Sequence, residues 1–293
     1  MLFISLALFL FDTQAAIIKH LGDRYPVQQL ALFRNIFGLL PSILVLALSQ
    51  AWHRSGRKIS FSQWRFGLFR GLILGVAQYC FYLGITKLAF ATATTLTYIG
   101  PIFITILSIP ILKHRVGIWR WVAVATGFIG VLLVIRTGTD VFTLYALLPL
   151  VAAFGYSLST ICVRLIDRSI PTALINLYAS IGALICSSGI LFFTTGYLPV
   201  KQPMDWLWLL AMGVVGGFAV FCMITAYRLT TPNKLSPFEY FGIPFAFIIG
   251  WLVFDETPFD RLFPGVIFII SGGLLVAWRE RKSNNTTAQN STL

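Results

Sequence analysis

The sequence predicts an all-α membrane protein of ten transmembrane helices, arranged as two inverted five-helix repeats. Three observations support this prediction: the composition, the spacing of the apolar segments and the similarity of the two halves. Of the 293 residues, 57% are hydrophobic and only 11% are charged, whereas about a quarter of the residues of a soluble domain are charged. The composition therefore indicates a membrane protein and leaves no room for a soluble catalytic domain.

Ten apolar segments are long enough to cross a bilayer, which takes about 20 mostly apolar residues. The first segment lacks the basic stretch and the small-residue cleavage site of a signal peptide, so we expect it to be a membrane span. The ten expected spans are 2–21, 28–50, 66–87, 90–112, 117–136, 142–164, 172–196, 206–228, 234–254 and 260–279.

The net charge of +12 has two interpretations, a nucleic-acid surface or the positive charge of cytoplasmic loops. With the N-terminus inside, fifteen of the 22 Lys and Arg residues lie on the cytoplasmic side, Arg70 among them, six lie outside, and Arg34 lies within a span. This asymmetry favours the loops and predicts no nucleic-acid partner. It places both termini in the cytoplasm of a bacterial inner-membrane protein, and the polar tail 283–293 is expected to be disordered.

The cysteines predict neither a metal site nor a disulfide. They lie inside apolar stretches, and no CxxC or Cys/His spacing is present. The sequence also lacks the GxxxxGK[ST] phosphate loop of an ATP-driven transporter. We expect no cofactor. The four cysteines are Cys80, Cys162, Cys186 and Cys222.

The two halves of the chain resemble each other. At a constant offset of 143, Pro101 aligns with Pro244, and Arg136 aligns with Arg279. Because each half holds five helices, the second copy must enter the membrane from the opposite side. We therefore expect inverted repeats over 1–137 and 138–282, with a substrate site near the midplane, as in many secondary transporters.

Several stretches resemble the drug/metabolite transporter superfamily in its ten-helix EamA-type branch. They are "FRNIFGLLP", "RGLILGVAQYCFYLGITKLAFATATTLTYIGPIF" and "WRWVAVATGFIGVLLVIR". The resemblance implies secondary transport without ATP. It departs from the family pattern after the fourth span, where Lys113-His114-Arg115 stands at the place of a frequent acidic residue, which Glu256 supplies in the second half.

The opening "RYPVQQLALFRNIFGLLP" is similar to that of EamA-type importers of riboflavin or S-adenosylmethionine. Uptake of riboflavin or a similar aromatic metabolite is the most specific hypothesis, and an S-adenosylmethionine transporter or an amino-acid exporter are the alternatives. An intramembrane enzyme is disfavoured, because His20, His53 and His114 lie at or beyond span ends. The predicted partners are a small-molecule substrate and the lipid bilayer, and both a monomer and a homodimer remain open.

Ionisable residues inside spans are costly, and such residues often mark transport sites. Asp12 is a candidate proton carrier or amine ligand, and Arg34 is a candidate anion ligand. The alternative is that the two form an ion pair. Glu239 is either the helix cap of a Ser236-Pro237 start or a coupling carboxylate near the cytoplasmic mouth.

Further candidates for substrate binding are polar or aromatic side chains that carry a hydrogen-bonding group. The flat apolar face and the hydroxyl of a tyrosine suit a substrate that contains a ring. The matched prolines Pro101 and Pro244 are expected to act as hinges. We expect the Gly71/Gly75 and Gly213/Gly217 pairs to mediate packing within the bundle, and Asp255, Glu256 and Asp260 to lie at the interface, solvated or paired with Arg261. The polar and aromatic candidates are Gln14, Gln78, Tyr79, Tyr82, Thr97, Tyr98, Asn176, Tyr178 and Tyr240.

Overall fold

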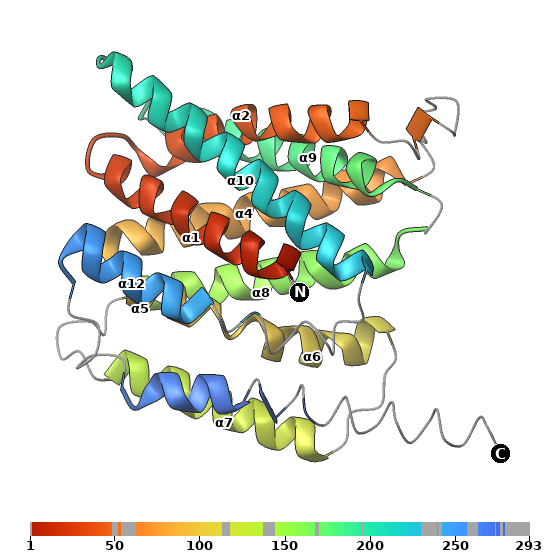
Figure 1. The fold of residues 1–293 in the computed structure, drawn as a ribbon, viewed down its shortest axis with the longest axis vertical. Helices are drawn as coiled ribbons and strands as arrows, with labels where there is room; N and C mark the ends of the chain where they lie inside the picture. The colour runs from red at the N-terminus through yellow and green to blue at the C-terminus, as the bar shows by residue number, and fades with distance from the viewer. Residues whose placement is uncertain are drawn as a thin grey trace.

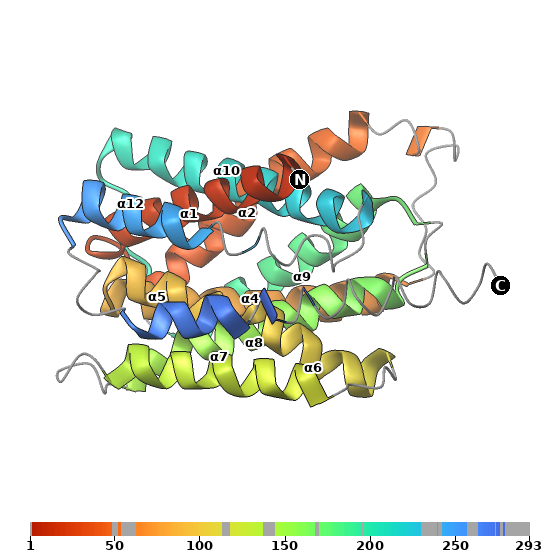
Figure 2. The same ribbon diagram turned by 60° about the horizontal axis from the view of Figure 1, so that its bottom comes forward.

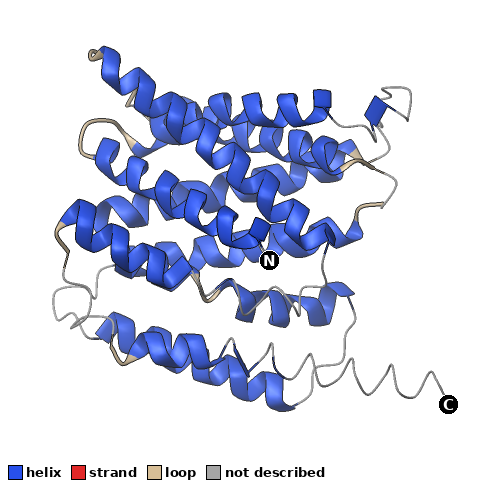
Figure 3. Cartoon of the chain, viewed as in Figure 1, coloured by secondary structure: helices blue, strands red, loops and turns tan. Residues whose placement is uncertain are grey.

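The computed structural model describes most of the chain as helix. The described residues are 2–48, 52–53, 63–112, 118–136, 144–167, 170–194, 196–229, 239, 242–256, 263–272, 274–275 and 278. No strand occurs among them, and the described part of the chain in Figure 3 consists of helices with short loops and turns. The predicted all-α class is therefore confirmed. The tail 283–293 lies outside the described residues.

The helices follow the order of the predicted spans. In the first half they are α1 (Leu2–Gly22), α2 (Val27–Leu48), α4 (Trp64–Lys87), α5 (Phe90–Thr97), α6 (Gly100–Leu112) and α7 (Ile118–Arg136). In the second half they are η1 (Leu144–Ala146), α8 (Leu147–Cys162), η2 (Val163–Leu165), α9 (Thr172–Phe193), α10 (Pro203–Leu229) and α12 (Gly242–Phe254). Residues 265–272 are also helical.

Seven helical segments within the described ranges are long and apolar enough to cross a membrane. The segments at 117–136, 234–254 and 260–279 also contain helix, over Ile118–Arg136, Gly242–Phe254 and 265–272. The chain is thus a multi-span membrane protein, and the count of ten spans stays a prediction.

The outer surface of the bundle is apolar. Leu40, Ile43 and Leu44 of α2 and Trp251 and Leu252 of α12 are all exposed. Large exposed apolar faces of this kind are rare on soluble proteins. A bilayer provides the environment that such a surface needs, because lipid tails solvate apolar side chains.

The long helices run side by side along a common direction (Figure 1). In Figure 2, α1, α2, α10 and α12 lie toward one side, and α4, α5, α7 and α8 lie toward the other. Helix α4 packs against α8 and α9, whereas α10 packs against α1 and α2. The two groups leave an interior region into which polar side chains of both halves project.

Glycines allow the closest helix contacts. A Cβ on Gly71 would lie 2.3 Å from the carbonyl oxygen of Ala179 on α9, and one on Gly213 would lie 2.3 Å from the Phe37 Cβ on α2. Small residues let two helix backbones approach in this way. The prediction that these glycines serve packing within the bundle agrees with both contacts.

The fourth apolar segment is a broken helix. Helix α5 ends at Thr97, Tyr98 and Ile99 form a turn, and α6 begins at Gly100. Pro101 explains the break, because proline has no N–H and its ring conflicts with the carbonyl four residues earlier. On α12, by contrast, Pro244 is the third residue, within the first turn, where no N–H is needed. The break brings the Tyr98 side chain into the interior of the bundle.

Candidate functional site

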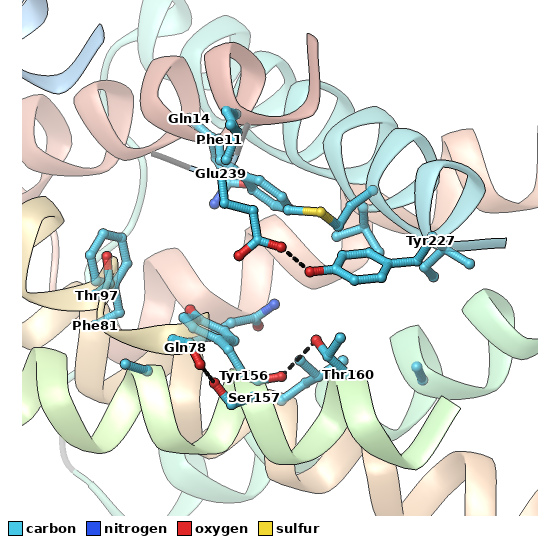
Figure 4. A pocket seen from close by; sticks show the side chains of 18 of the residues that line it. Phe11, Gln14, Gln78, Phe81, Thr97, Tyr156, Ser157, Thr160, Tyr227 and Glu239 are labelled. Carbon is cyan, nitrogen blue, oxygen red and sulfur yellow. Dashed lines mark hydrogen bonds between the residues drawn. The ribbon is translucent and has the colours of Figure 1, made fainter. Parts of the chain in front are cut away.

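A cavity of about 290 Å³ lies inside the bundle. Its lining comes from α1, α2, α4, α5, α6, α8, α9 and α10 and from residue 239, so both halves contribute. Aromatic rings and hydrogen-bonding groups alternate around it, and Figure 4 shows Phe11, Phe81, Tyr156 and Tyr227 among them. This lining suits a ligand that has both a flat apolar part and polar groups.

The structure brings most of the predicted site residues to this cavity. Tyr79 instead packs against a core cluster to which α1, α2, α4 and α10 contribute, and Tyr178 is buried in the cluster that contains Leu46 and Leu174. Pro244 is exposed on α12, and Tyr240 lies outside the described residues. The residues that do line the cavity are Asp12, Gln14, Arg34, Gln78, Tyr82, Thr97, Tyr98, Pro101, Asn176 and Glu239.

Asp12 lies on α1 beside the broken helix. Its side chain is only 3% exposed, and the Tyr98 hydroxyl lies 3.3 Å from each carboxylate oxygen. The same hydroxyl lies against the first residue of α12, since a Cβ on Gly242 would be 1.8 Å from it. Tyr98 therefore joins α1, the α5–α6 break and the start of α12 at one point.

Ser157, on α8 in the second half of the chain, contacts the same helix break. Its hydroxyl donates a 2.9 Å hydrogen bond to the carbonyl of Gly100, and it lines the cavity beside Tyr156 (Figure 4). Ser157 is the residue that the repeat aligns with Asp12. The break is therefore contacted by matched positions of the two halves, but only one of them is a carboxylate.

Glu239 lies at another part of the cavity wall. It is buried and accepts a short hydrogen bond from the hydroxyl of Tyr227 on α10, and Figure 4 shows the two side chains pointing toward one another. Residues Ser236 and Pro237, on which the alternative of a helix cap depends, lie outside the described ranges. The contact with Tyr227 and the cavity lining both favour a role at the cavity for Glu239.

Arg34 is held by neutral partners. Its nitrogens donate to Gln14 Oε1 at 3.5 Å, Asn35 Oδ1 at 3.0 Å and the Gly216 carbonyl at 3.3 Å. Gln14 in turn donates to the Tyr82 hydroxyl at 2.9 Å. The structure does not form the ion pair with Asp12 that the sequence left open, because the two ion pairs found among the described residues involve other side chains.

Arg70 is a cavity residue that sequence reasoning missed. The charge count places it with the cytoplasmic loops, but it lies within α4, is 4% exposed and lines the cavity. Its Nε donates to the carbonyl of Ser159 at 2.9 Å. Its position six residues inside an apolar helix could have revealed it, because a loop charge lies outside such a run. Tyr156 was also missed, as an ordinary aromatic residue of an apolar span.

Ionised side chains also gather at the end of the bundle where α1 ends, and there they pair with each other. Lys19 Nζ lies 2.5 Å from Glu256 Oε1, and Glu256 also accepts the backbone N–H groups of Phe90 and Ala91 at 2.9 and 3.4 Å. Glu256 thus caps the start of α5, where a negative charge is stabilising. Glu256 thus pairs with Lys19, and Asp255 is exposed as expected, whereas Asp260 and Arg261 lie outside the described residues.

A second pair lies at the same end of α1. Asp205, at the start of α10, is buried, and it accepts hydrogen bonds from Arg24 at 2.7 Å and from the Tyr25 hydroxyl at 2.6 Å. This hydrogen bond, together with burial, raises the pKa of Tyr25 above its usual value near 10. Since the protonated phenol makes the bond, its stabilising effect is present at neutral pH and is lost as the pH rises through this raised pKa.

A bundle of membrane-length helices around a polar and aromatic cavity defines the class of membrane carriers. The EamA-like transporter family matches residues 1–136 and again residues 143–278. The chain therefore belongs to the EamA-like transporter family. This membership confirms the predicted resemblance and the prediction that the chain is a transporter and not an enzyme.

Individual relatives carry more specific names. The chain is 30% identical over 185 residues to a riboflavin transporter of Vibrio cholerae, a match that covers 63% of this chain and 61% of that protein. It is 25% identical to an S-adenosylmethionine uptake transporter of Rickettsia prowazekii, over 90% of this chain and 87% of that protein. It is also 25% identical to a riboflavin transporter of Brucella anthropi, over 83% of this chain and 87% of that protein.

The fold is similar to that of a solved crystal structure. The superposition has a TM-score of 0.67 and covers 96% of this chain and 97% of the other, at 18% sequence identity. This similarity supports the arrangement of helices over nearly the whole chain.

Proposed function

We propose that this chain is a secondary carrier of the bacterial inner membrane that takes up an aromatic metabolite, with riboflavin as the first candidate substrate. The observation that supports this most is the interior cavity, in which aromatic rings and hydrogen-bonding groups from both halves surround one space. A fused ring system gains from stacking on Phe and Tyr faces, and its polar edge gains from groups such as Gln78 and Asn176. Two of the related transporters are named for riboflavin.

S-adenosylmethionine is the second candidate. The transporter of this metabolite from Rickettsia prowazekii matches 90% of the chain. The cavity also holds two carboxylates, Asp12 and Glu239, that could bind a cationic substrate group. Riboflavin lacks such a group, whereas S-adenosylmethionine has two.

The carrier proposal includes ten spans in two inverted repeats, 1–137 and 138–282. The family model supports it by matching each half separately, over residues 1–136 and 143–278. The packing supports it as well, because α4 contacts α9 and α8 whereas α10, its counterpart, contacts α2 and α1. In the repeat, α8 corresponds to α1 and α9 corresponds to α2. The two sets of contacts are therefore related by the same exchange of halves that a two-fold axis in the membrane plane would produce. Both termini would then lie in the cytoplasm.

Alternating access needs an element that moves, and accumulation of substrate against its gradient also needs a group that couples transport to an ion gradient. Asp12 is the proposed proton carrier, because its carboxylate is buried and its partner among the described residues is one hydroxyl, which also tolerates the neutral acid. Tyr98 lies in the break between α5 and α6, and Pro101 is the second residue of α6. We assign hinge roles to this break and to the start of α12 at Pro244.

The test is transport by the purified protein in liposomes. Riboflavin, S-adenosylmethionine and aromatic amino acids are each supplied outside, with and without an inward proton gradient. The proposal predicts saturable uptake of riboflavin or S-adenosylmethionine that increases with the gradient. Saturable movement of amino acids alone would favour the exporter alternative, and flux that does not saturate would indicate a channel.

A further inference from the structure

We propose that Arg70 binds an anionic group of the substrate, so that the transported metabolite is elongated, with a carboxylate or phosphate at one end and a ring system at the other. This inference rests on the proposed function and narrows it to anionic metabolites. Riboflavin 5′-phosphate and S-adenosylmethionine fit it, whereas riboflavin, which has no anionic group, does not. Neither the sequence pattern nor the named relatives assign a role to this residue.

The first argument is the state of the Arg70 side chain. It is 4% exposed, and one guanidinium nitrogen, Nε, donates to the carbonyl of Ser159. A second nitrogen, Nη1, is fully buried and has no partner among the described residues. A guanidinium has five N–H donors in a fork that matches carboxylate and phosphate oxygens. Arg70 thus lines the cavity, and its guanidinium carries a donor nitrogen that no described protein group satisfies.

The second argument is the charge distribution around the cavity. The carboxylates of Asp12 and Glu239 are bound by the hydroxyls of Tyr98 and Tyr227. Neither carboxylate forms an ion pair with Arg70 in the described part of the chain. A buried cation without an opposite charge is costly in a membrane. An anionic substrate group would offset this cost, and no carboxylate among the described residues forms an ion pair that does so.

The third argument is the order of side chains along α4. Arg70, Leu74, Gln78 and Phe81 all line the cavity, and their spacing of three and four residues puts them on one helix face. Gln78 Oε1 is also buried without a partner among the described residues. Along this face come a cation, an apolar side chain, an acceptor and an aromatic ring. The span from Arg70 to Phe81 is about 16 Å at the rise of an α-helix, which suits an elongated ligand.

The experiment compares pairs of compounds that differ in one anionic group. Riboflavin is compared with riboflavin 5′-phosphate, and decarboxylated S-adenosylmethionine with S-adenosylmethionine. Binding to purified protein is measured by thermal shift and titration, and uptake is measured in liposomes. In at least one pair the anionic member should bind about tenfold more tightly or better, as expected for a charge-assisted pair. The pair that shows this identifies the group as phosphate or carboxylate.

Variants of α4 connect the preference to Arg70. Arg70→Gln should abolish the difference within the pair, and Arg70→Lys, which keeps the charge, should retain part of it. Arg65→Gln is the matched control, because Arg65 is an exposed residue of the same helix and its loss should leave the preference unchanged. The melting temperature of each ligand-free variant shows whether it is folded.

The results separate this inference from the proposed function. If the anionic member of neither pair binds more tightly than its partner, the inference is wrong, whether or not uptake occurs. It is also wrong if folded Arg70→Gln weakens both members equally. If binding shows the anionic preference but no compound is taken up, the proposed transport function is wrong and the assignment of Arg70 stands.

Discussion

Ionisable side chains gather in two regions of this molecule, and their hydrogen-bonding and ionic partners differ between the two. At the end where α1 finishes, Lys19 pairs with Glu256, and Arg24 pairs with Asp205. In the cavity, the described partners of Asp12 and Arg34 are hydroxyl, amide and carbonyl groups. A charge paired with an opposite charge is satisfied by the protein alone, whereas a charge bound only by neutral groups can still respond to a substrate or a proton.

The comparison suggests that the ion-paired residues stabilise the fold and that the cavity residues serve transport. The ion pairs join helices that are distant in sequence, since Glu256 connects α1 through Lys19 and α5 through its N-terminal N–H groups. The cavity charges make weaker internal contacts and are retained in spite of the cost of burial. We therefore expect changes at the ion-paired end to affect stability and changes in the cavity to affect transport.

The largest expected effect is at Asp12. Asp12→Asn keeps the size of the side chain and a hydrogen bond with Tyr98 but cannot carry a proton. Accumulation of substrate driven by a proton gradient should fall to the background level, while exchange of substrate across the membrane continues. Liposome uptake and counterflow measure the two activities separately. The exposed residue Asp23 offers the control Asp23→Asn, and full accumulation by folded Asp12→Asn would refute the proton-carrier role.

A large effect on stability is expected at Asp205. Asp205→Asn leaves Arg24 without its ion-pair partner and weakens the bond from Tyr25, so we expect a loss of about 2 kcal/mol. Thermal unfolding in detergent measures it, and binding of substrate by the folded variant should stay within about twofold of the wild type. A variant that keeps its stability but loses substrate binding would show that Asp205 serves transport and not stability, which contradicts the comparison.

A moderate effect is expected from a single added methyl group at Gly242. In Gly242→Ala the Cβ would overlap the Tyr98 hydroxyl, so Tyr98 must move away from Asp12. We expect the uptake rate to fall severalfold, with a change in melting temperature that corresponds to about 1 kcal/mol. Gly189→Ala is the matched control, because nothing lies within 4 Å of a Cβ at that position. Equal rates for the two variants would show that the Tyr98–Asp12 contact is dispensable.

The smallest effect is expected at Tyr25. Tyr25→Phe removes one hydrogen bond to Asp205 and leaves the ion pair with Arg24 in place, so the loss should be about 1 kcal/mol. The melting temperature of the wild type should also fall more steeply than that of Tyr25→Phe as the pH rises from about 10, the usual pKa of tyrosine, through the raised pKa of Tyr25. Identical alkaline profiles would mean that the hydrogen bond does not contribute.

The sequence was sufficient for the features that depend on local composition. Apolar runs give the helices, and charges such as Asp12 and Arg34 stand out because they interrupt those runs. Arg70 was misassigned because the charge count grouped it with the basic loop residues that precede α4, although it lies six residues inside that helix. The pair Lys19–Glu256 joins residues 237 positions apart, and such a contact depends on how the helices pack. Pro101 in the sequence indicated a hinge near the helix break at Tyr98, but the contact of the Tyr98 hydroxyl with Gly242 depends on helix packing and could not be predicted.

The most direct test of the central claim uses the same substitution in the two regions. Glu239→Gln removes a cavity carboxylate whose described partner is Tyr227, and Glu256→Gln removes a carboxylate that pairs with Lys19. Melting temperature and gradient-driven uptake are measured for both. We predict that Glu239→Gln keeps the wild-type melting temperature and loses at least about tenfold in uptake, whereas Glu256→Gln lowers the melting temperature by several degrees and keeps uptake within about twofold of the wild type. The account is contradicted if Glu239→Gln unfolds at a lower temperature and Glu256→Gln does not, or if both variants change the same quantity to the same extent.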